Sequence, residues 1–257
     1  MIGKIVRIIF VFTIITSFSM GCALGPRVLP TNPGNPIGSV AILPMLNNSD
    51  DVNAPTRVRE AFYNRLLRYH YNVQALKETN DILNLQMGIT LGRQLDLATA
   101  QQIGETLGVD GVFYGYLLNF DAVTTGVANT YNVRMGWKLV NTKTGNIAWG
   151  KGVGVRSSQS IGGLAGLASN EAEEVGPLPG SVNPMKEMPG LNRWISMGNQ
   201  STGLVEGLVM GIGGAVVSGI SGKNLESEMN FALNRIFPGM LIGPGVQAGI
   251  ASKMEIR

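Results

Sequence analysis

The residue with the clearest chemistry in this chain is Cys22, its only cysteine, because a lone thiol cannot form an internal disulfide. It follows an N-terminal segment with two positive residues, Lys4 and Arg7, and an almost unbroken apolar stretch over residues 8–15. This is the layout of a cleaved export signal, and the apolar stretch is too short for a comfortable transmembrane helix. We therefore expect Cys22 to begin the mature protein and to carry lipid, since two or more acyl chains anchor a protein stably.

The sequence around Cys22 leaves one alternative open. Bacterial lipoprotein signals usually place leucine three residues before the cysteine, whereas this chain has Ser19 there, so its lipidation signal is a relaxed one. The alternative is an ordinary signal peptide that is cut nearby and leaves a free thiol. The small residues before Cys22 favour lipidation, with residues 1–21 as the signal. Ala23, rather than an aspartate, follows the cysteine and favours sorting to the outer membrane.

Other reactive groups are few. The single histidine, His70, ends an expected helix, where its partial charge suits the helix dipole, so a histidine-based metal cluster or a Ser-His-Asp triad is not favoured. Oxygen ligands gather over residues 47–53 and could bind calcium, but we favour a turn followed by a helix cap. We therefore expect a non-enzyme with no cofactor, no metal and no small-molecule substrate.

Composition narrows the class of protein further. The chain has 257 residues, enough for one good-sized domain with an appendage. Lys4 and Arg7 supply two of its three excess positive charges, which leaves the mature chain at about +1. Without a Lys/Arg cluster, nucleic-acid binding is excluded. The 35 glycines far exceed the usual share of about 7% and concentrate after residue 150, so the chain has two compositional halves.

Residues 38–156 predict a domain of the α+β class, built in α/β layers. Strands are expected from their apolar runs and alternation at residues 39–45, 71–75, 109–120, 131–140 and 147–155. Helices are expected from a cap at Asn53 through Tyr69, over residues 77–86, and from Asp96 to a stop at Gly108. This order predicts a mixed β-sheet with helices mainly on one face and a long terminal hairpin, whose Trp137 belongs to the core.

The remaining segments have other compositions. Residues 22–37 form a Pro/Gly-rich tether, and residues 157–200 are expected to be a glycine-rich loop or insertion. Residues 201–257 are expected to hold the C-terminal helices and tail, a glycine-rich helical segment that includes an amphipathic helix over residues 223–237.

Small residues recur at every fourth position near the C-terminus, in what we call the small-residue stripe: Gly203, Gly207, Gly211, Ala215 and Gly219. On a helix they form one smooth face where another backbone can approach closely. Each glycine costs a helix about 1 kcal/mol relative to alanine, so a compensating contact is expected. That contact is either helix association between protomers or in a bilayer, or packing onto the chain's own sheet or onto the helix at 223–237.

Four segments together resemble a family of bacterial lipoproteins of unknown function typified by a meningococcal surface lipoprotein; they are residues 39–54, 107–114, 140–150 and 236–244. The resemblance covers most of residues 38–156 and, more weakly, 200–245, and the long segment 157–200 departs from it. That family is similar in fold to the N-terminal domain of the Tol translocation protein and to lipoproteins of curli secretion and peptidoglycan-synthase activation. The resemblance implies a small α/β domain that works by protein contacts and has no catalytic residues.

The sequence thus predicts a lipid-anchored, non-catalytic envelope protein of the outer membrane, with its domain in the periplasm or at the cell surface. Its expected partners are membrane lipid, through Cys22, and either copies of itself or other envelope proteins. The alternative is an accessory subunit of an envelope secretion or transport machine whose glycine-rich segments contact or insert into the membrane.

Overall fold

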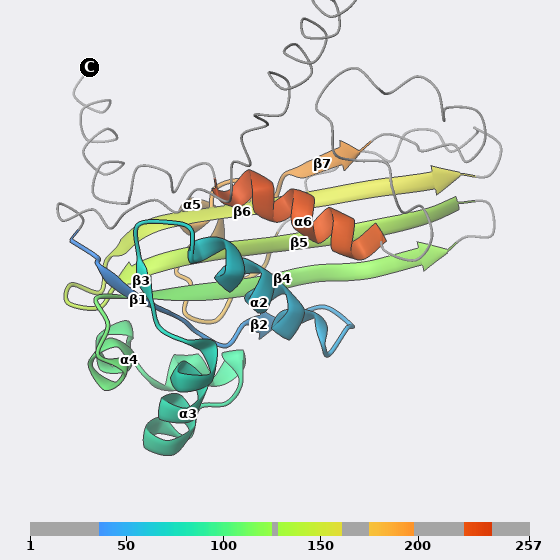
Figure 1. Cartoon of the computed structure of the whole chain (residues 1–257). Helices are drawn as coiled ribbons and strands as arrows, with labels where there is room; N and C mark the ends of the chain where they lie inside the picture. The colour runs from blue at the N-terminus through green and yellow to red at the C-terminus, as the bar shows by residue number, and fades with distance from the viewer. Residues whose placement is uncertain (1–35, 125–127, 161–174, 198–223, 238–257) are drawn as a thin grey trace, which may run out of the picture.

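A seven-stranded mixed sheet organises the chain (Figure 1). The structure is a computed structural model that describes residues 36–124, 128–160, 175–197 and 224–237. The strands lie in the order β3-β1-β4-β5-β6-β7, with β2 beside β4. Their bounds are β1 Ser39–Ile42, β2 Leu46–Asn47, β3 Asn72–Val73, β4 Gly111–Thr124, β5 Ala128–Asn141, β6 Ile147–Ser160 and β7 Trp194–Met197.

The sheet combines a parallel part and an antiparallel part. Strands β3, β1 and β4 run parallel, and β4, β5 and β6 form an antiparallel meander of 14-residue strands. Pro44 separates β1 from β2, since proline has no N–H to donate to the ladder. Strand β7 pairs with β6 in parallel and is the last strand on that side of the sheet in the described ranges.

Helices cover both faces of this sheet. Their bounds are α2 Ala54–Leu66, α3 Leu76–Met87, the 3₁₀ helix η1 Gly92–Leu97, α4 Ala100–Leu107, α5 Pro184–Glu187 and α6 Asn224–Ile236. Helices α2 and α6 lie side by side across one face, whereas α3, η1 and α4 pack on the other (Figure 1). The α+β class with a mixed sheet is confirmed, but the prediction of helices mainly on one face is wrong. Alternate residues of the apolar run 40–43 point to opposite faces, so both faces need a cover.

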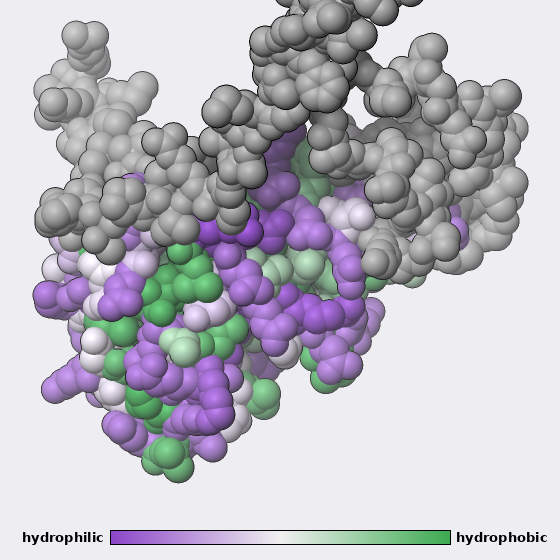
Figure 2. Space-filling model, viewed as in Figure 1, coloured by the Kyte–Doolittle hydropathy of each residue, from purple (hydrophilic) through white to green (hydrophobic). Residues whose placement is uncertain are grey.

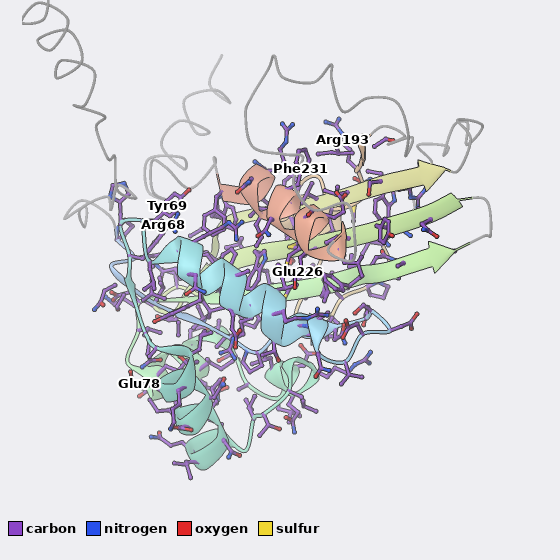
Figure 3. All side chains as sticks on the ribbon, turned by 45° about the vertical axis from the view of Figure 1, so that its right-hand side comes forward. Arg68, Tyr69, Glu78, Arg193, Glu226 and Phe231 are labelled. Atoms are coloured by element: carbon purple, nitrogen blue, oxygen red, sulfur yellow. The ribbon has the colours of Figure 1, made fainter. Side chains whose placement is uncertain are left out.

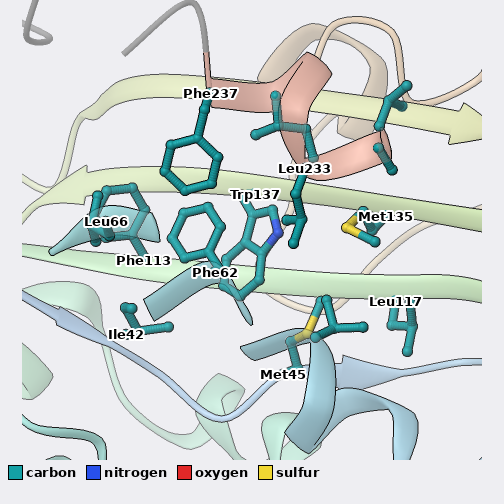
Figure 4. Close-up of a cluster of buried hydrophobic side chains, with 14 of the residues drawn as sticks. Ile42, Met45, Phe62, Leu66, Phe113, Leu117, Met135, Trp137, Leu233 and Phe237 are labelled. Carbon is teal, nitrogen blue, oxygen red and sulfur yellow. The ribbon is translucent and has the colours of Figure 1, made fainter. Parts of the chain in front are cut away.

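The face under α2 and α6 holds the larger core (Figure 4). Phe62 of α2 stacks on Trp137 of β5 with ring centroids 3.8 Å apart, and Phe237, directly after α6, lies 4.9 Å from Phe62. Phe113 of β4 meets Phe62 edge-on at 5.4 Å. Trp137 is completely buried, which confirms its predicted place in the core. Aromatic contacts of this kind add about 0.5–1.5 kcal/mol each beyond the area they bury.

The start of one predicted helix differs from the structure, whereas its end agrees. The helix expected from Asp96 instead begins after Thr99, whose hydroxyl accepts a hydrogen bond from the Gln102 N–H while the Gln102 side chain accepts one from the Thr99 N–H. The capping box at Thr99, rather than the acidic Asp96, therefore determines where helix α4 begins. Gly108 does end the helix, with φ of 68°, a left-handed conformation that favours glycine.

The region predicted as a loop or insertion, residues 157–200, is partly ordered. Strand β6 continues to Ser160, and residues 175–197, which we call the strap, contain α5 and β7 and pack on the sheet. Helix α6 matches the helix predicted over residues 223–237. The division of the chain into domains stays a prediction.

Candidate functional site

The residues that the sequence singles out as sites lie outside the described residues. Cys22 belongs to the N-terminal segment, and the small-residue stripe belongs to residues 198–223, so both sites stay predictions. Within the described ranges, no helix is long and apolar enough to cross a membrane.

The polar stretch 47–53 forms a turn and a helix cap. Asn47 donates from its side-chain amide to the Asp51 carbonyl oxygen at 3.0 Å. The Asp51 carboxylate accepts the N–H groups of Asn53 and Ala54 at 2.8 and 3.0 Å, and so caps α2 in place of the predicted Asn53. Its other oxygen pairs with Arg57. The favoured interpretation of these residues thus agrees with the hydrogen bonds, and the parts of the chain that the structure describes contain no group of three or more His, Cys, Asp or Glu side chains arranged to hold a metal.

An open groove of about 240 Å³ lies between α2 and α6, over the far part of β4. Its lining residues come from all three elements: Arg57, Glu60, Ala61, Asn64, Phe120, Glu226 and Met229. The α2 members recur every three or four residues, so they line one side of the helix next to its buried face. Phe120 and Met229 are buried and, with Ala61, make the groove apolar at its base. We call this feature the α2–α6 groove.

The charges around the α2–α6 groove are unequally paired. The Arg57 guanidinium lies 5.1 Å from the Phe120 ring centroid and forms an ion pair with Asp51. The carboxylates of Glu60 and Glu226 have no ion pair with any described residue. Figure 3 shows Glu226 near the start of α6, on the side next to α2. The rim therefore carries two carboxylates without an ion pair in the described ranges, and Glu60 has in addition a favourable charge interaction with the neighbouring Arg59.

Part of the opposite face of the sheet, over β4, β5 and β6, is covered by the strap, which a buried ion pair holds. The Lys138 ammonium lies 3.0 Å from a Glu187 carboxylate oxygen, and the two side chains are only 4% and 8% exposed. Lys138 also donates to the Gly180 carbonyl, and the Ser181 hydroxyl donates to Glu187. Burial alone would raise the pKa of Glu187, but the hydrogen bonds from Ser181 and Lys138 outweigh it and lower that pKa.

Glycines make room for the strap on this face. A methyl group added at Gly150 would lie 1.7 Å from the Glu187 carbonyl oxygen, and one at Gly152 would lie 2.6 Å from the Leu191 Cα. The N–H of Gly152 donates to the Pro189 carbonyl at 3.0 Å, so backbone meets backbone along the β6 edge. Alternate glycines in a strand indicate such a close approach, and this is the signal that sequence reasoning missed.

The strap also engages a tyrosine of the central strand. The Tyr116 hydroxyl donates to the Pro179 carbonyl at 3.0 Å. Burial raises the pKa of Tyr116 well above its usual range, and the nearby Glu187 carboxylate adds to this shift. The polar side chains under the strap therefore serve to hold a segment of the chain.

The surface seen in Figure 2 mixes polarities. Over the described residues, hydrophobic side chains form separate patches among hydrophilic ones. Contacts on this side would therefore use small apolar features with polar surroundings, as in the α2–α6 groove.

Comparison with known proteins places this fold in a family. The family described as "Putative lipoprotein GNA1162-like" matches residues 34–172. The matched range contains β1 to β6, whereas the strap and α6 lie beyond it. No curated protein matches the chain.

Three examples illustrate the solved structures to which the chain is similar. Lipoprotein GNA1162 from Neisseria meningitidis has 20% identity over 46% of this chain and 82% of that one, with a TM-score of 0.44. The LpoB C-terminal domain from Salmonella enterica has 14% identity over 48% and 86%, with a TM-score of 0.33. The PelC dodecamer from Paraburkholderia phytofirmans has 14% identity over 49% and 75%, with a TM-score of 0.32.

Proposed function

The chain belongs to the GNA1162-like family, and from this premise we propose that it is a lipid-anchored, non-catalytic protein of the bacterial envelope that acts through protein contacts. The family match over residues 34–172 carries the proposal. The export-type N-terminus that ends at Cys22 supports the lipid anchor, and Ala23 supports a place in the outer membrane.

The described residues support a binding role over a catalytic one. The α2–α6 groove has a volume of about 240 Å³, below the roughly 300–1,000 Å³ of small-molecule sites. The buried Lys138 and Glu187 are both engaged in holding the strap. A small groove with a charged rim suits a side chain of another protein better than a substrate.

Metabolic labelling with a fatty-acid analogue tests the anchor. Wild type is expected to take up label, Cys22→Ser to take up none, and Ser19→Leu to mature at least as completely, because it restores the usual leucine. Label that survives Cys22→Ser, or its absence from wild type, would contradict the anchor.

Self-association is the finer part of the proposal, and the small-residue stripe favours it. The mass of the detergent-solubilised full chain is expected to be a multiple of the monomer mass, and Gly207→Leu with Gly211→Leu is expected to reduce it. A monomeric wild type would contradict self-association.

The same stripe favours a second candidate, an accessory subunit of an envelope secretion or transport machine that contacts the membrane directly. Alkaline carbonate washing separates the two candidates. Release of the Cys22→Ser protein from membranes fits a lipid-only anchor, and retention favours the machine subunit.

A further inference from the structure

The α2–α6 groove has the shape and charge to hold one long cationic side chain. We propose that it is a docking site for a lysine or arginine side chain of a partner protein. This inference rests on the proposed function, because it names the chemistry of one of the protein contacts through which the chain acts.

The base of the groove suits the aliphatic part of such a side chain. Phe120 is 2% exposed and Met229 7%, so both are fixed in the core and present only a small apolar surface to the groove. Lysine and arginine bury their methylene stems on apolar surface while the charged head stays at the rim. The volume of about 240 Å³ leaves room for a side chain but not for a drug-sized ligand.

The rim provides the complementary charge. Glu60 on α2 and Glu226 on α6 line opposite sides of the groove, and neither forms an ion pair with another described residue. Arg57 is the cation among the lining residues, and Asp51 already neutralises it. A partner's anion would be repelled by two carboxylates, whereas a partner's ammonium or guanidinium group would be attracted to both.

Arg57 illustrates the interaction within the chain itself. Its guanidinium lies over the Phe120 ring at 5.1 Å from the centroid and contacts a carboxylate, Asp51. A cation between an aromatic ring and a carboxylate gains from both. The groove offers a second cation the carboxylates of Glu60 and Glu226 beside an apolar base.

The helix dipole favours only one of the two rim carboxylates. Glu226 lies in the first turn of α6, where a negative charge favours the helix dipole. Glu60 lies in the second turn of α2, where that effect has largely faded. The carboxylate of Glu60 is therefore available at the rim of the groove.

Methionine methyl NMR tests the proposal directly, because Met229 lines the groove and Met188 belongs to the strap on the opposite face. The full chain, labelled with ¹³C-methyl methionine and solubilised in detergent, is titrated with N-acetyl-arginine amide at millimolar concentrations. N-acetyl-norleucine amide, which has the stem without the charge, and N-acetyl-glutamate amide serve as control probes. The Met229 signal is expected to shift with the arginine probe alone, while Met188 stays unchanged.

Charge-neutral variants sharpen the test. The double variant Glu60→Gln with Glu226→Gln is expected to bind the arginine probe about fivefold more weakly. Glu78→Gln, on α3 and away from the groove (Figure 3), is the matched control and is expected to bind as wild type does. An unchanged Met188 signal in each variant verifies the fold.

Three results would overturn the proposal: no Met229 shift with the arginine probe, an equal shift with norleucine, or equal binding by the double glutamine variant. Each of these leaves fatty-acid labelling at Cys22 and the oligomer mass unaffected. Failure of the docking site is thereby distinguished from failure of the proposed function.

Discussion

The two faces of the sheet are covered in different ways. On one face, α2 and α6 bring large aromatic side chains onto Trp137, and the contact is apolar throughout its centre. On the other, α3, η1 and α4 cover one part, and the strap covers the part where it lies on glycines and is held by backbone hydrogen bonds and the buried Lys138–Glu187 pair. Apolar burial supplies most of the free energy of folding, whereas a buried ion pair fixes where a segment lies more than it adds stability. We therefore expect the apolar cover by α2 and α6 to contribute to global stability and the strap to be a locally separable cover.

The largest effect is expected from Trp137→Ala. The substitution leaves a cavity beside Phe62 and lowers the free energy of unfolding by about 3–5 kcal/mol. Urea unfolding followed by circular dichroism measures this loss. Leu85→Ala is the matched control, because Leu85 is 83% exposed and surface changes usually stay within about 0.5 kcal/mol. Equal losses in the two variants would contradict the assignment of the core.

Lys138→Met is expected to have a large but local effect. It leaves the Glu187 carboxylate buried without its cation, a loss of about 3–5 kcal/mol if the strap stays in place. If the strap instead detaches, water hydrates the Glu187 carboxylate. The free energy of global unfolding then falls by less. Hydrogen exchange of β6 amides that bond the strap, such as Gly152, is expected to accelerate about a hundredfold.

A substitution that clashes with the backbone of the strap gives the matched comparison for Lys138→Met. Gly150→Val should displace the strap while both charged side chains of the ion pair are retained, since its Cβ would overlap the Glu187 carbonyl. Exchange in α2 should stay unchanged in both variants. Faster exchange of α2 and β6 together would show that the two faces open as one unit.

The smallest expected effect is an opposite response of the two covers to pH. Burial raises the pKa of Glu228 in α6, and the Ser157 hydroxyl only partly offsets this shift. A carboxyl with a raised pKa stabilises the fold below its usual value of 4.5, and this stability is lost as the pH rises through the folded-state pKa. Glu187 has a lowered pKa, so its contribution is present above 4.5 and is lost as the pH falls through its folded-state pKa.

Protection of α6 is therefore expected to fall as the pH rises above about 4.5, whereas protection of the strap falls below it. Hydrogen exchange, corrected for the intrinsic pH dependence of the rate, measures both. Glu228→Gln should remove the response of α6 and leave that of the strap. The same pH response in both covers would contradict these assignments.

The two faces also differ in how far the sequence could predict them. The buried side of α2 and the strands β4 to β6 follow from hydrophobic periodicity, because these contacts need apolar residues at regular spacing. The strap contact relies on the absence of side chains at Gly150 and Gly152, and glycine-rich sequence indicates a loop just as readily. Nothing near Lys138 in the sequence indicates its partner, which lies 49 residues further on.

The α2–α6 groove also could not be predicted from the sequence, because residues that are distant in the sequence form it. Its rim carboxylates, Glu60 and Glu226, come from two helices that are far apart in the sequence. Its base includes Phe120 from the central meander. Glu60 lies within the family-matched range 34–172 and Glu226 lies beyond it. The groove is thus assembled jointly by the family domain and by a helix outside the matched range.

The proposed lipid anchor at Cys22 is the central claim, because it would determine where the α2–α6 groove meets a partner. Intact mass spectrometry of the protein purified from membranes tests it most directly. The expected mass is that of a chain lacking residues 1–21, increased by a diacylglycerol and an N-acyl group on Cys22. The mass of the uncleaved chain, or of a chain that begins at or near Cys22 without lipid, would contradict it.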